Sequence, residues 1–219
     1  MDARQQILDS IREALKQPSH MPDEPSRDEL IKATAFGQQS LEEKIQAFKS
    51  ELTAVSAECI EVSSEAEIPG KIETILKESS VREVSVSGGA IIDRIGRGLS
   101  ERGISVVRPE TLPEETRKNA IAKIIVGVVE VPYAIADTAT LVVPLNGRST
   151  QPHYLPEIVI ALVSTGKLFS NHFEMFSKLS SEEKKNLILV TGPSRTADIE
   201  KILILGAHGP RRLGVFLMK

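Results

Sequence analysis

A turn-rich stretch near the carboxyl end carries the residue types best suited to hold an acidic ligand, and it reads Thr191-Gly192-Pro193-Ser194-Arg195-Thr196-Ala197-Asp198-Ile199-Glu200. It follows an apolar run, residues 186–190, that is typical of a buried strand. The hydroxyls of Ser194 and Thr196 can each cap a helix whose first turn contains Asp198. Unpaired backbone N–H groups at such a junction, together with the planar guanidinium of Arg195, favour a carboxylate or a phosphate. The stretch therefore predicts an anion-binding site, and the alternative is a capped helix start with a solvated arginine.

A second group of polar residues lies where other apolar segments end. Asp137 and Thr138 separate two apolar runs, 124–129 and 140–143, so they are either hydrogen-bonded caps inside the fold or the lining of a cleft. His208 stands in a glycine-rich turn before the last apolar run. Because the carboxyl ends of parallel strands share one edge of a sheet, we expect these side chains and the anion-binding stretch to meet in one cleft at that edge.

The carboxyl-terminal segment is basic within an acidic protein. The whole chain has a net charge of −3, whereas residues 192–219 contain five lysine or arginine side chains against two acidic ones, a local excess of +3. This excess would draw an anion to that end of the molecule. In an enzyme built on these residues, Asp137 or Asp198 would be the general base, His208 a general acid or base, and Arg195 the anion clamp.

The order of these motifs resembles the LUD-domain family, in particular its lactate utilisation protein C branch. The resemblance rests on GPSRTADIE, which begins at Gly192, on GAHGP, which begins at Gly206, and on the apolar run that follows. It extends to residues 134–142 and 155–156, and in outline to the amino-terminal helices. The family usually shows Glu-Thr-Gly-Thr-Leu where this chain has the sequence Asp137-Thr138-Ala139-Thr140-Leu141, which changes the reach of the acid and the width of a pocket.

This resemblance implies a fold, a function and partners. The family is grouped with ribose-5-phosphate isomerase, glucosamine-6-phosphate deaminase and the CoA-transferases, so it implies an α/β fold with a twisted, mostly parallel sheet and helices on both faces. Members of the C branch act with two iron–sulfur proteins, A and B, in the oxidation of L-lactate to pyruvate. The chain would then be an accessory subunit of such a system, with a carboxylate or a partner's acidic group in its anion cleft. The ligand-binding residues in this interpretation are Thr138, Gly192, Ser194, Arg195, Thr196 and Gly209.

The alternative function is a stand-alone enzyme of the same superfamily that acts on a sugar phosphate or an acyl-CoA. No glutamate in the apolar-turn setting of a CoA-transferase nucleophile is evident, so we prefer the accessory role. Cys59 is the only cysteine, so the chain alone cannot hold an iron–sulfur cluster, and we expect the clusters on the partner proteins. Cys59 itself lies in an alternating segment typical of a strand, where a free thiol behaves as a small core residue.

Composition excludes several classes of function. A chain of 219 residues with 41% hydrophobic content can bury one sizeable core. The pI near 5.9 and the 4% aromatic content argue against a nucleic-acid partner. No apolar run approaches the length of a membrane span and no signal-peptide core is evident, so we expect a cytoplasmic protein without a membrane span.

Hydrophobic periodicity predicts two parts. Residues 1–27 contain an amphipathic helix, which must end before Pro18, and a proline-rich linker; the helix can pack on its own body or on a second copy. Residues 28–219 are expected to form the LUD-like α/β domain. A helix over residues 41–55 is followed, from about residue 57, by apolar runs that alternate with amphipathic segments, which favours a parallel sheet.

Three other segments complete the sequence interpretation. Gly88-Gly89 is predicted to be a tight turn, with a ligand wall as the alternative, because two glycines match neither a dinucleotide fingerprint nor a P-loop. Residues 146–154 form a polar loop in which Arg148 and His153 are expected to be solvated. Residues 166–184 are predicted to be helical, with phenylalanines on the apolar face.

Overall fold

The fold is described from a computed structural model, which covers residues 3–16, 26, 39–145, 149–196, 204–206 and 209–219. The chain separates into two compact units, Met1–Gly37 and Gln38–Lys219. Within the described residues, no helix combines the length and apolar character needed to cross a bilayer.

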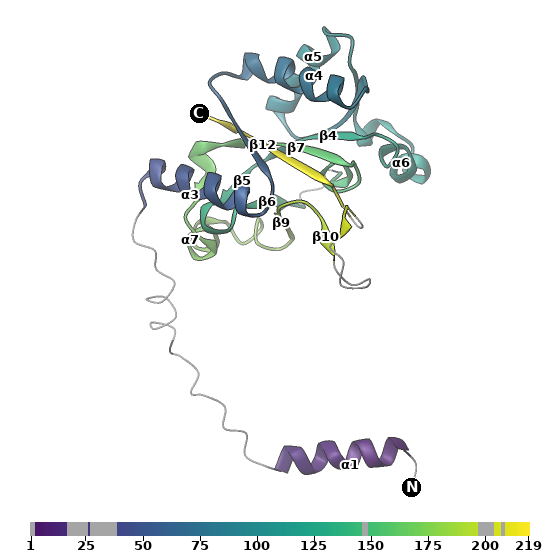
Figure 1. Ribbon diagram of the computed structural model, residues 1–219, viewed down its shortest axis with the longest axis vertical. Helices are drawn as coiled ribbons and strands as arrows, with labels where there is room; N and C mark the ends of the chain where they lie inside the picture. Colours follow the sequence, from purple (N-terminus) through teal and green to yellow (C-terminus); the bar gives the residue numbers. More distant parts are fainter. Residues whose placement is uncertain (1–2, 17–25, 27–38, 146–148, 197–203, 207–208) are drawn as a thin grey trace. The chain divides into compact units, whose positions relative to one another are not determined.

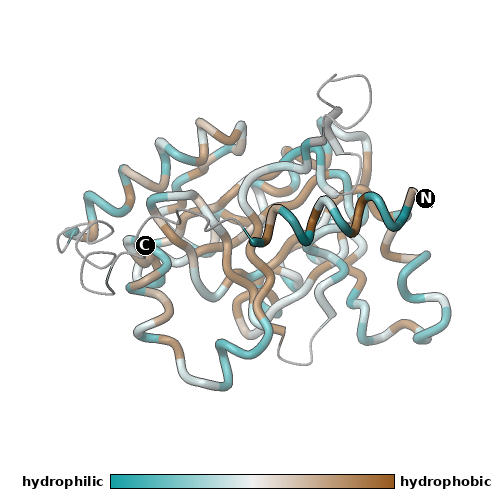
Figure 2. Tube along the Cα trace, turned by 90° about the horizontal axis from the view of Figure 1, so that it is seen from below, coloured by the Kyte–Doolittle hydropathy of each residue, from teal (hydrophilic) through white to brown (hydrophobic). Residues whose placement is uncertain are grey.

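The amino-terminal unit contains helix α1 (Ala3–Lys16), as the periodicity predicts. None of its residues is buried, and its apolar stripe stays largely open, with Ile7 62% exposed and Leu15 79% exposed. Figure 2 shows the alternation of apolar and polar segments along this helix. An isolated helix of this length is marginal in water unless its apolar face is covered.

We expect deletion of residues 1–27 to leave the larger unit folded but to weaken association with itself or a partner. Since residues 1–27 belong to a separate compact unit, the free energy of unfolding of the larger unit should change by less than about 0.5 kcal/mol. Thermal melting and light scattering on the full and shortened chains would measure both effects. A large fall in melting temperature with unchanged assembly would contradict this prediction.

The larger unit is built on a six-stranded sheet in which every pair of neighbours is parallel. In spatial order the strands are β1 (Glu58–Val62), β12 (Arg212–Met218), β7 (Ile158–Ser164), β4 (Val126–Val131), β2 (Glu83–Ser87) and β3 (Ser105–Val107). The predicted parallel α/β sheet is confirmed. The central strands are rich in valine, isoleucine and leucine because a strand covered on both faces has no polar side.

Helices cover both faces of this sheet (Figure 1). Helices α4 (Ile68–Glu78) and α5 (Ala90–Ser100) pack with one set of strand side chains, and α3 (Leu41–Ala54) buries Phe48 and Leu52 with the opposite set. A capping box starts α3: Ser40 Oγ accepts from the Glu43 backbone N–H at 3.2 Å, and Glu43 Oε2 accepts from the Ser40 N–H at 2.7 Å. The short helix α6 (Glu114–Ile121) follows β3.

A second sheet lies on the α3 side of the first, and the sequence did not predict it. Its order is β8 (Leu168–Phe169), β5 (Tyr133–Ile135), β6 (Thr140–Pro144) and β9 (Leu187–Thr191). Strand β6 pairs antiparallel with both β5 and β9. Residues 186–190 were predicted to form a buried strand. They do contribute a strand, β9, but it lies at the edge of its sheet and Leu189 is 45% exposed, so the predicted burial is wrong.

The predicted helix over residues 166–184 is also wrong over most of its length. The segment forms η5 (Thr165–Lys167) and β8, and only α7 (His172–Lys178) is an α-helix, capped by the side chain of Asn171. Pairing of β8 with β5 uses the backbone that the helix would have needed. Met175 and Leu179 are buried, whereas Phe173 and Phe176 are exposed.

The order of the strands shows where successive strands change from one side of β2 to the other. From β2 the chain moves outward to β3 and then returns to β4, on the other side of β2. Loops that leave neighbouring strands in opposite directions open a crevice at the carboxyl ends of those strands, and ligands bind at such switch points in open α/β sheets. The gap between the carboxyl ends of β2 and β4 is therefore where a ligand site is expected.

Candidate functional site

A small cavity of about 90 Å³ lies at this switch point. It is lined by the end of β2, the end of β4, the end of β6 and the segment that leads into η4 (Gln151–His153). The lining residues are Ser87, Gly88, Glu130, Pro132, Val143, Pro144, Ser149, Thr150 and His153. The cavity thus combines acceptor groups with one apolar wall.

Gly88 and Glu130 form one side of the cavity, and Glu130 can occupy its position only because residue 88 is a glycine. Gly88 has a φ of +155°, and a Cβ atom there would lie 2.6 Å from Glu130 Cβ and 2.4 Å from Ile92 Cγ1, so only glycine fits. The close approach lets Glu130 Oε2 accept a hydrogen bond from the Gly89 N–H at 2.6 Å. Glu130 therefore caps helix α5, whose N-cap residue Gly89 has no side chain to do so. The positive end of α5 is thus occupied by a carboxylate.

The opposite wall is a segment fastened at two points. Ser87 Oγ donates to the carbonyl of Ser149 at 2.7 Å, and the Ser149 N–H donates to Glu110 Oε1 at 3.0 Å. These bonds tie the segment before η4 to strand β2 and to η2 (Pro109–Thr111). The position of the wall is therefore set by the fold.

A glycine in the middle of the sheet positions η4. At Gly127 an added Cβ would lie 2.3 Å from the Pro152 carbonyl oxygen and 2.9 Å from Pro156 Cγ. Only a strand without a side chain at this point lets η4 pack flat on β4. As a result His153 is 6% exposed, and the prediction that it is a solvated loop residue is wrong. Arg148, the other residue of that prediction, lies outside the described residues.

His153 is held as a neutral imidazole. Burial lowers its pKa from 6.5 to about 4, against the smaller raising effect of the Thr150 carbonyl, which lies 3.1 Å from Nδ1. With Nδ1 protonated and donating to that carbonyl, Nε2 carries a lone pair and can only accept. The described residues provide no partner for Nε2.

Two further buried oxygens close to η4 are also without partners among the described residues: Ser85 Oγ and Gln151 Oε1. Ser85 lies on the same face of β2 as Ser87 and pairs with Gly127 in the register of β2 and β4. Buried polar atoms in folded proteins normally have partners. Three unsatisfied atoms around one short helix therefore mark a place built to be completed by something else.

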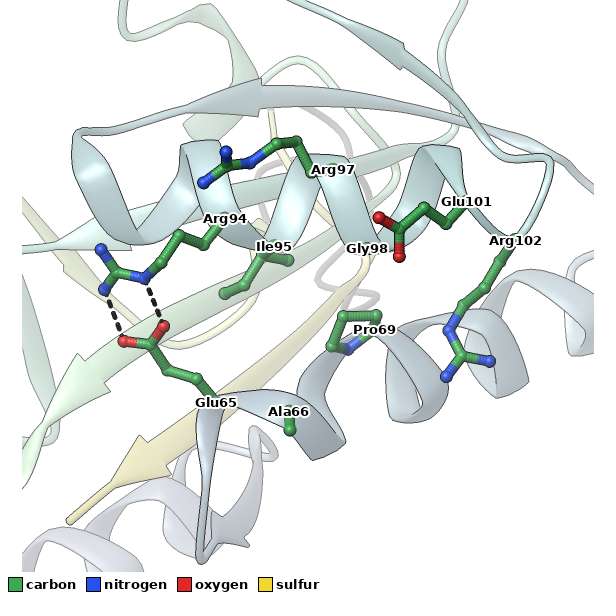
Figure 3. A pocket seen from close by; sticks show the side chains of 9 residues that line it. All are labelled: Glu65, Ala66, Pro69, Arg94, Ile95, Arg97, Gly98, Glu101 and Arg102. Atoms are coloured by element: carbon green, nitrogen blue, oxygen red, sulfur yellow. Dashed lines mark hydrogen bonds and ion pairs between the residues drawn. The ribbon is translucent and has the colours of Figure 1, made fainter.

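A larger hollow of about 460 Å³ lies between α4 and α5, and two of its three arginines, Arg94 and Arg102, are paired with carboxylates (Figure 3). Glu65 receives two hydrogen bonds from Arg94, at 2.6 and 2.7 Å, and Arg102 pairs with Glu73 at 3.1 Å. No residue of this hollow contributes an unsatisfied buried atom within the described part of the chain. We therefore regard the smaller cavity as the candidate site.

The anion-binding stretch has a different local structure from the one predicted. Arg195 and Thr196 form β10, which pairs antiparallel with β11 (Ile204–Leu205), so a helix capped by Ser194 is wrong. A helix capped by Thr196 and opened by Asp198 would lie outside the described residues. The Ser194 N–H donates to the Pro210 carbonyl at 2.8 Å, and the Ser194 carbonyl accepts from the Gly206 N–H at 2.9 Å. Both backbone groups of Ser194 are therefore already used.

Its place in the fold also differs. Pro210 lies two residues before the start of β12, so the hydrogen bond from Ser194 puts the stretch at the amino end of β12, not at the predicted carboxyl edge. Gly209 lies beside Ser194, and Gly192 packs against Val55, with which Arg195 also bonds: its Nη2 donates to the Val55 carbonyl at 2.5 Å. The positional premise failed because β9 is not a strand of the parallel sheet.

Antiparallel pairing nevertheless brings Thr138 near this stretch. Thr140 Oγ1 lies 2.9 Å from Thr138 Oγ1 and 2.7 Å from Thr191 Oγ1, so three hydroxyls connect η3 (Ala136–Thr138) to the residue before Gly192. Asp137 Oδ1 is buried, with no partner among the described residues. Asp198 and His208, the other catalytic candidates, lie outside the described residues.

Ala139 explains the glycine that the family resemblance leads one to expect there. It adopts a left-handed conformation, with φ of +49° and ψ of +37°, and is fully buried. Such a conformation is tolerated best by glycine. The motif therefore reflects a backbone requirement at the entrance to β6 as well as any ligand contact.

The sequence interpretation missed Glu130, Ser149 and His153 as residues of one site. Two signals for them were present in the chain: the glycine pair that follows β2, and Gly127, which interrupts an otherwise continuous apolar strand. A glycine inside a buried strand marks a close approach of another segment. What it cannot reveal is which segment approaches.

The fold and cavity define an open parallel α/β protein with a small polar site at the switch point of its sheet. The chain belongs to the LUD domain family, whose model matches residues 45–218. A crystal structure of a DUF162 family protein from Deinococcus radiodurans has a similar fold, with a TM-score of 0.61 and 20% identity over 83% of this chain and 99% of that one.

Two curated relatives align over almost their whole length. Lactate utilization protein C of Bacillus pumilus (strain SAFR-032) is 25% identical, covering 98% of this chain and 95% of the relative. The uncharacterized protein YkgG of Escherichia coli (strain K12) is 26% identical, covering 96% of this chain and 95% of the relative.

Proposed function

We propose that this protein is the C-type accessory subunit of a cytoplasmic system that oxidises L-lactate to pyruvate, working with the iron–sulfur proteins A and B. The observation that carries the proposal is the end-to-end alignment with a relative named lactate utilization protein C, across 98% of this chain.

The chemistry of the chain supports an accessory role. Cys59, the only cysteine, lies half-buried in β1, and burial raises the pKa of its thiol, which disfavours the thiolate that a metal or an electrophile requires. Within the described residues, no three His, Cys, Asp or Glu side chains are grouped to hold a metal ion. The redox cofactors of lactate oxidation would therefore reside on the partner proteins.

The alternative, a stand-alone enzyme for a sugar phosphate or an acyl-CoA, receives less support. Sites for such ligands typically occupy about 300–1,000 Å³, whereas the cavity at the switch point has about 90 Å³. Glu130 also occupies the end of α5 where a phosphate would otherwise bind.

Co-purification tests the accessory role. A tagged chain expressed in its native host should recover two iron–sulfur proteins, and the iron and visible absorbance should stay with them when the complex is separated. The isolated chain should be colourless, with an iron content far below one atom per chain. Stoichiometric iron in the isolated chain, or normal growth on L-lactate of a strain that lacks the gene, would contradict the proposal.

The anion cleft is part of the same proposal and rests on Arg195. Its side chain is exposed, and one of its N–H groups donates to the Val55 carbonyl. Within the described residues the other N–H groups of the guanidinium have no partner, so they can bind a carboxylate. Thr138, Gly192, Ser194 and Gly209 would form the surround, and the Thr196 side chain lies outside the described residues.

Replacing Arg195 with alanine should weaken the binding of a partner's acidic group or of a free carboxylate by about 1.5–3 kcal/mol, because a charge-assisted hydrogen bond is lost. The free energy of unfolding should fall by about 1 kcal/mol or less, since the bond to Val55 is exposed. Arg195→Lys keeps the charge but loses the fork, and so should recover only part of the binding. Titration calorimetry and urea unfolding measure the two effects. Unchanged binding together with a large loss of stability would show that Arg195 is only a brace for α3.

A further inference from the structure

We propose that the cavity between the carboxyl ends of β2 and β4 binds a small, uncharged, hydroxyl-bearing compound, whose hydroxyl groups donate to His153 Nε2 and to Glu130. This inference stands apart from the proposed role in lactate oxidation. It rests on the buried atoms that surround the cavity and on their hydrogen-bonding capacity.

The first step is the state of His153. His153 is only 6% exposed because Pro152 packs on Gly127. The residue lines the cavity, and its Nδ1 donates to the Thr150 carbonyl. A buried imidazole nitrogen without a partner costs about 1–3 kcal/mol unless something donates to it. This unfavourable free energy arises at the cavity, next to the ends of β2 and β4.

The second step is the bias of the lining toward acceptors. Glu130 contributes a carboxylate. Within the described residues, its one hydrogen bond is the one that Oε2 accepts from the Gly89 N–H. Ser87 donates its hydroxyl proton to the Ser149 carbonyl, so its oxygen can offer only an acceptor, whereas the Thr150 hydroxyl in the lining can donate as well as accept. To satisfy His153 Nε2 and the Glu130 carboxylate, a ligand must therefore carry hydrogen-bond donors. A carboxylate or phosphate brings only acceptors, and it would also face the negative charge of Glu130.

The third step is size and polarity. The cavity of about 90 Å³ has room for about three water molecules at roughly 30 Å³ each, or for a compound of a few non-hydrogen atoms. Pro132, Val143 and Pro144 line it as well, and an apolar wall suits a carbon skeleton better than a cluster of water. A short polyol or a diol has both features.

The test uses the full-length chain labelled with ¹⁵N-histidine. Glycerol, 1,2-propanediol, L-lactate and pyruvate are added in turn, and the His153 Nε2 resonance is followed by NMR. Glycerol and propanediol should shift it with a Kd on the order of millimolar, the range open to so few atoms. L-lactate should bind more weakly because of its charge, and pyruvate, which has no hydroxyl, should not shift the resonance.

Variants assign any shift to this site. His153→Phe keeps the bulk of the ring but removes the acceptor, and should reduce affinity for glycerol at least tenfold. Because this variant lacks the histidine reporter, its binding is followed on uniformly ¹⁵N-labelled chain through the Gly89 N–H, which donates to Glu130 of the cavity. His172→Phe, on α7 and outside the cavity, is the matched control and should change nothing. Glu130→Gln keeps an oxygen acceptor for Gly89 while removing the charge, so it should raise the affinity for L-lactate relative to glycerol. The Glu130 variant is read by this ratio, so an unfolded His153 variant would not block the test.

Three results would overturn the inference. The first is no shift with any of the four compounds at 100-fold above the expected Kd, which would mean that the cavity holds water only. The second is an equal shift with pyruvate and glycerol, which would refute recognition of a hydroxyl. The third is binding that survives in His153→Phe, which would place the compound elsewhere.

Discussion

Replacing Gly127 with alanine should destabilise the protein by about 1–3 kcal/mol, although the substitution adds only a methyl group. The new Cβ would lie 2.3 Å from the carbonyl oxygen of Pro152 and 2.9 Å from Pro156 Cγ. The first of these atoms belongs to backbone and cannot rotate away as a side chain can. Because β4 is hydrogen-bonded on both sides, by β7 and β2, the strand cannot retreat, and η4 must lift from the sheet.

A matched glycine provides the control. Gly96 is buried in the interior of α5, and a Cβ there would meet its nearest neighbour, Val106 Cγ1, at 3.5 Å, an ordinary contact. Gly96→Ala should therefore stabilise the protein by about 0.4–1 kcal/mol, since alanine restricts the unfolded chain and favours a helix. Urea unfolding of both variants measures the difference. The same sign of change in the two variants would show that close contact with η4 is not what requires Gly127.

The Gly127 variant also tests whether η4 shields the cavity. If η4 lifts, water reaches His153, and the pKa of its imidazole should rise from about 4 toward 6.5, because burial is the main cause of its depression. NMR titration of His153 in the folded variant would detect the change.

The part of the fold that sequence could predict is the part determined by burial on two faces. Continuous apolar runs such as 124–129 and the final run before residue 219 have no polar side, so they had to be interior strands of a parallel sheet. Helix α3 was equally clear from the spacing of its apolar residues. In each case the information lies within a single segment.

The rest depended on partners that no local pattern specifies. Strand β9 looked interior because it is apolar, but among the described strands it pairs with β6 alone and ends its sheet. Residues 168–169 lie within a segment that has a helical pattern, yet they pair with β5 as a strand. His153 looked like a loop residue because its burial is caused by Gly127, a contact that only the folded sheet creates. The candidate site consists mainly of residues of this last kind.

The buried neutral His153 should make the protein lose stability as the pH falls from about 6.5 to about 4. In the unfolded chain the imidazole has its ordinary pKa, whereas in the folded protein burial lowers this pKa to about 4. Between these values the unfolded state binds a proton that the folded state does not, so lowering the pH favours unfolding. The stabilisation is fully present above about pH 6.5. The loss across the window should be about 3 kcal/mol.

The charged groups on the elements around η4 are Glu130 on β4, Glu83 on β2, Glu110 on η2, and four residues of α6: Glu114, Glu115, Arg117 and Lys118. None of them accounts for the depressed pKa, which arises from burial against the smaller raising effect of Thr150. Carboxylates act in a lower range. Burial would raise the pKa of Glu174, but hydrogen bonds from Lys178 and from the Ser170 N–H outweigh this and lower it to about 2, so its contribution is lost below about pH 4.5.

Unfolding by urea at intervals between pH 7 and pH 4 would measure this dependence in the native chain, in His153→Phe and in His172→Phe. The native chain and the His172 variant should lose stability together, with a slope that flattens above pH 6.5. In His153→Phe that slope should nearly vanish between pH 6.5 and about pH 5, above the range in which the carboxylates titrate, even if the variant is less stable throughout. A slope that persists in His153→Phe would mean that another group titrates, and that His153 is not held neutral by the packing of η4 on Gly127.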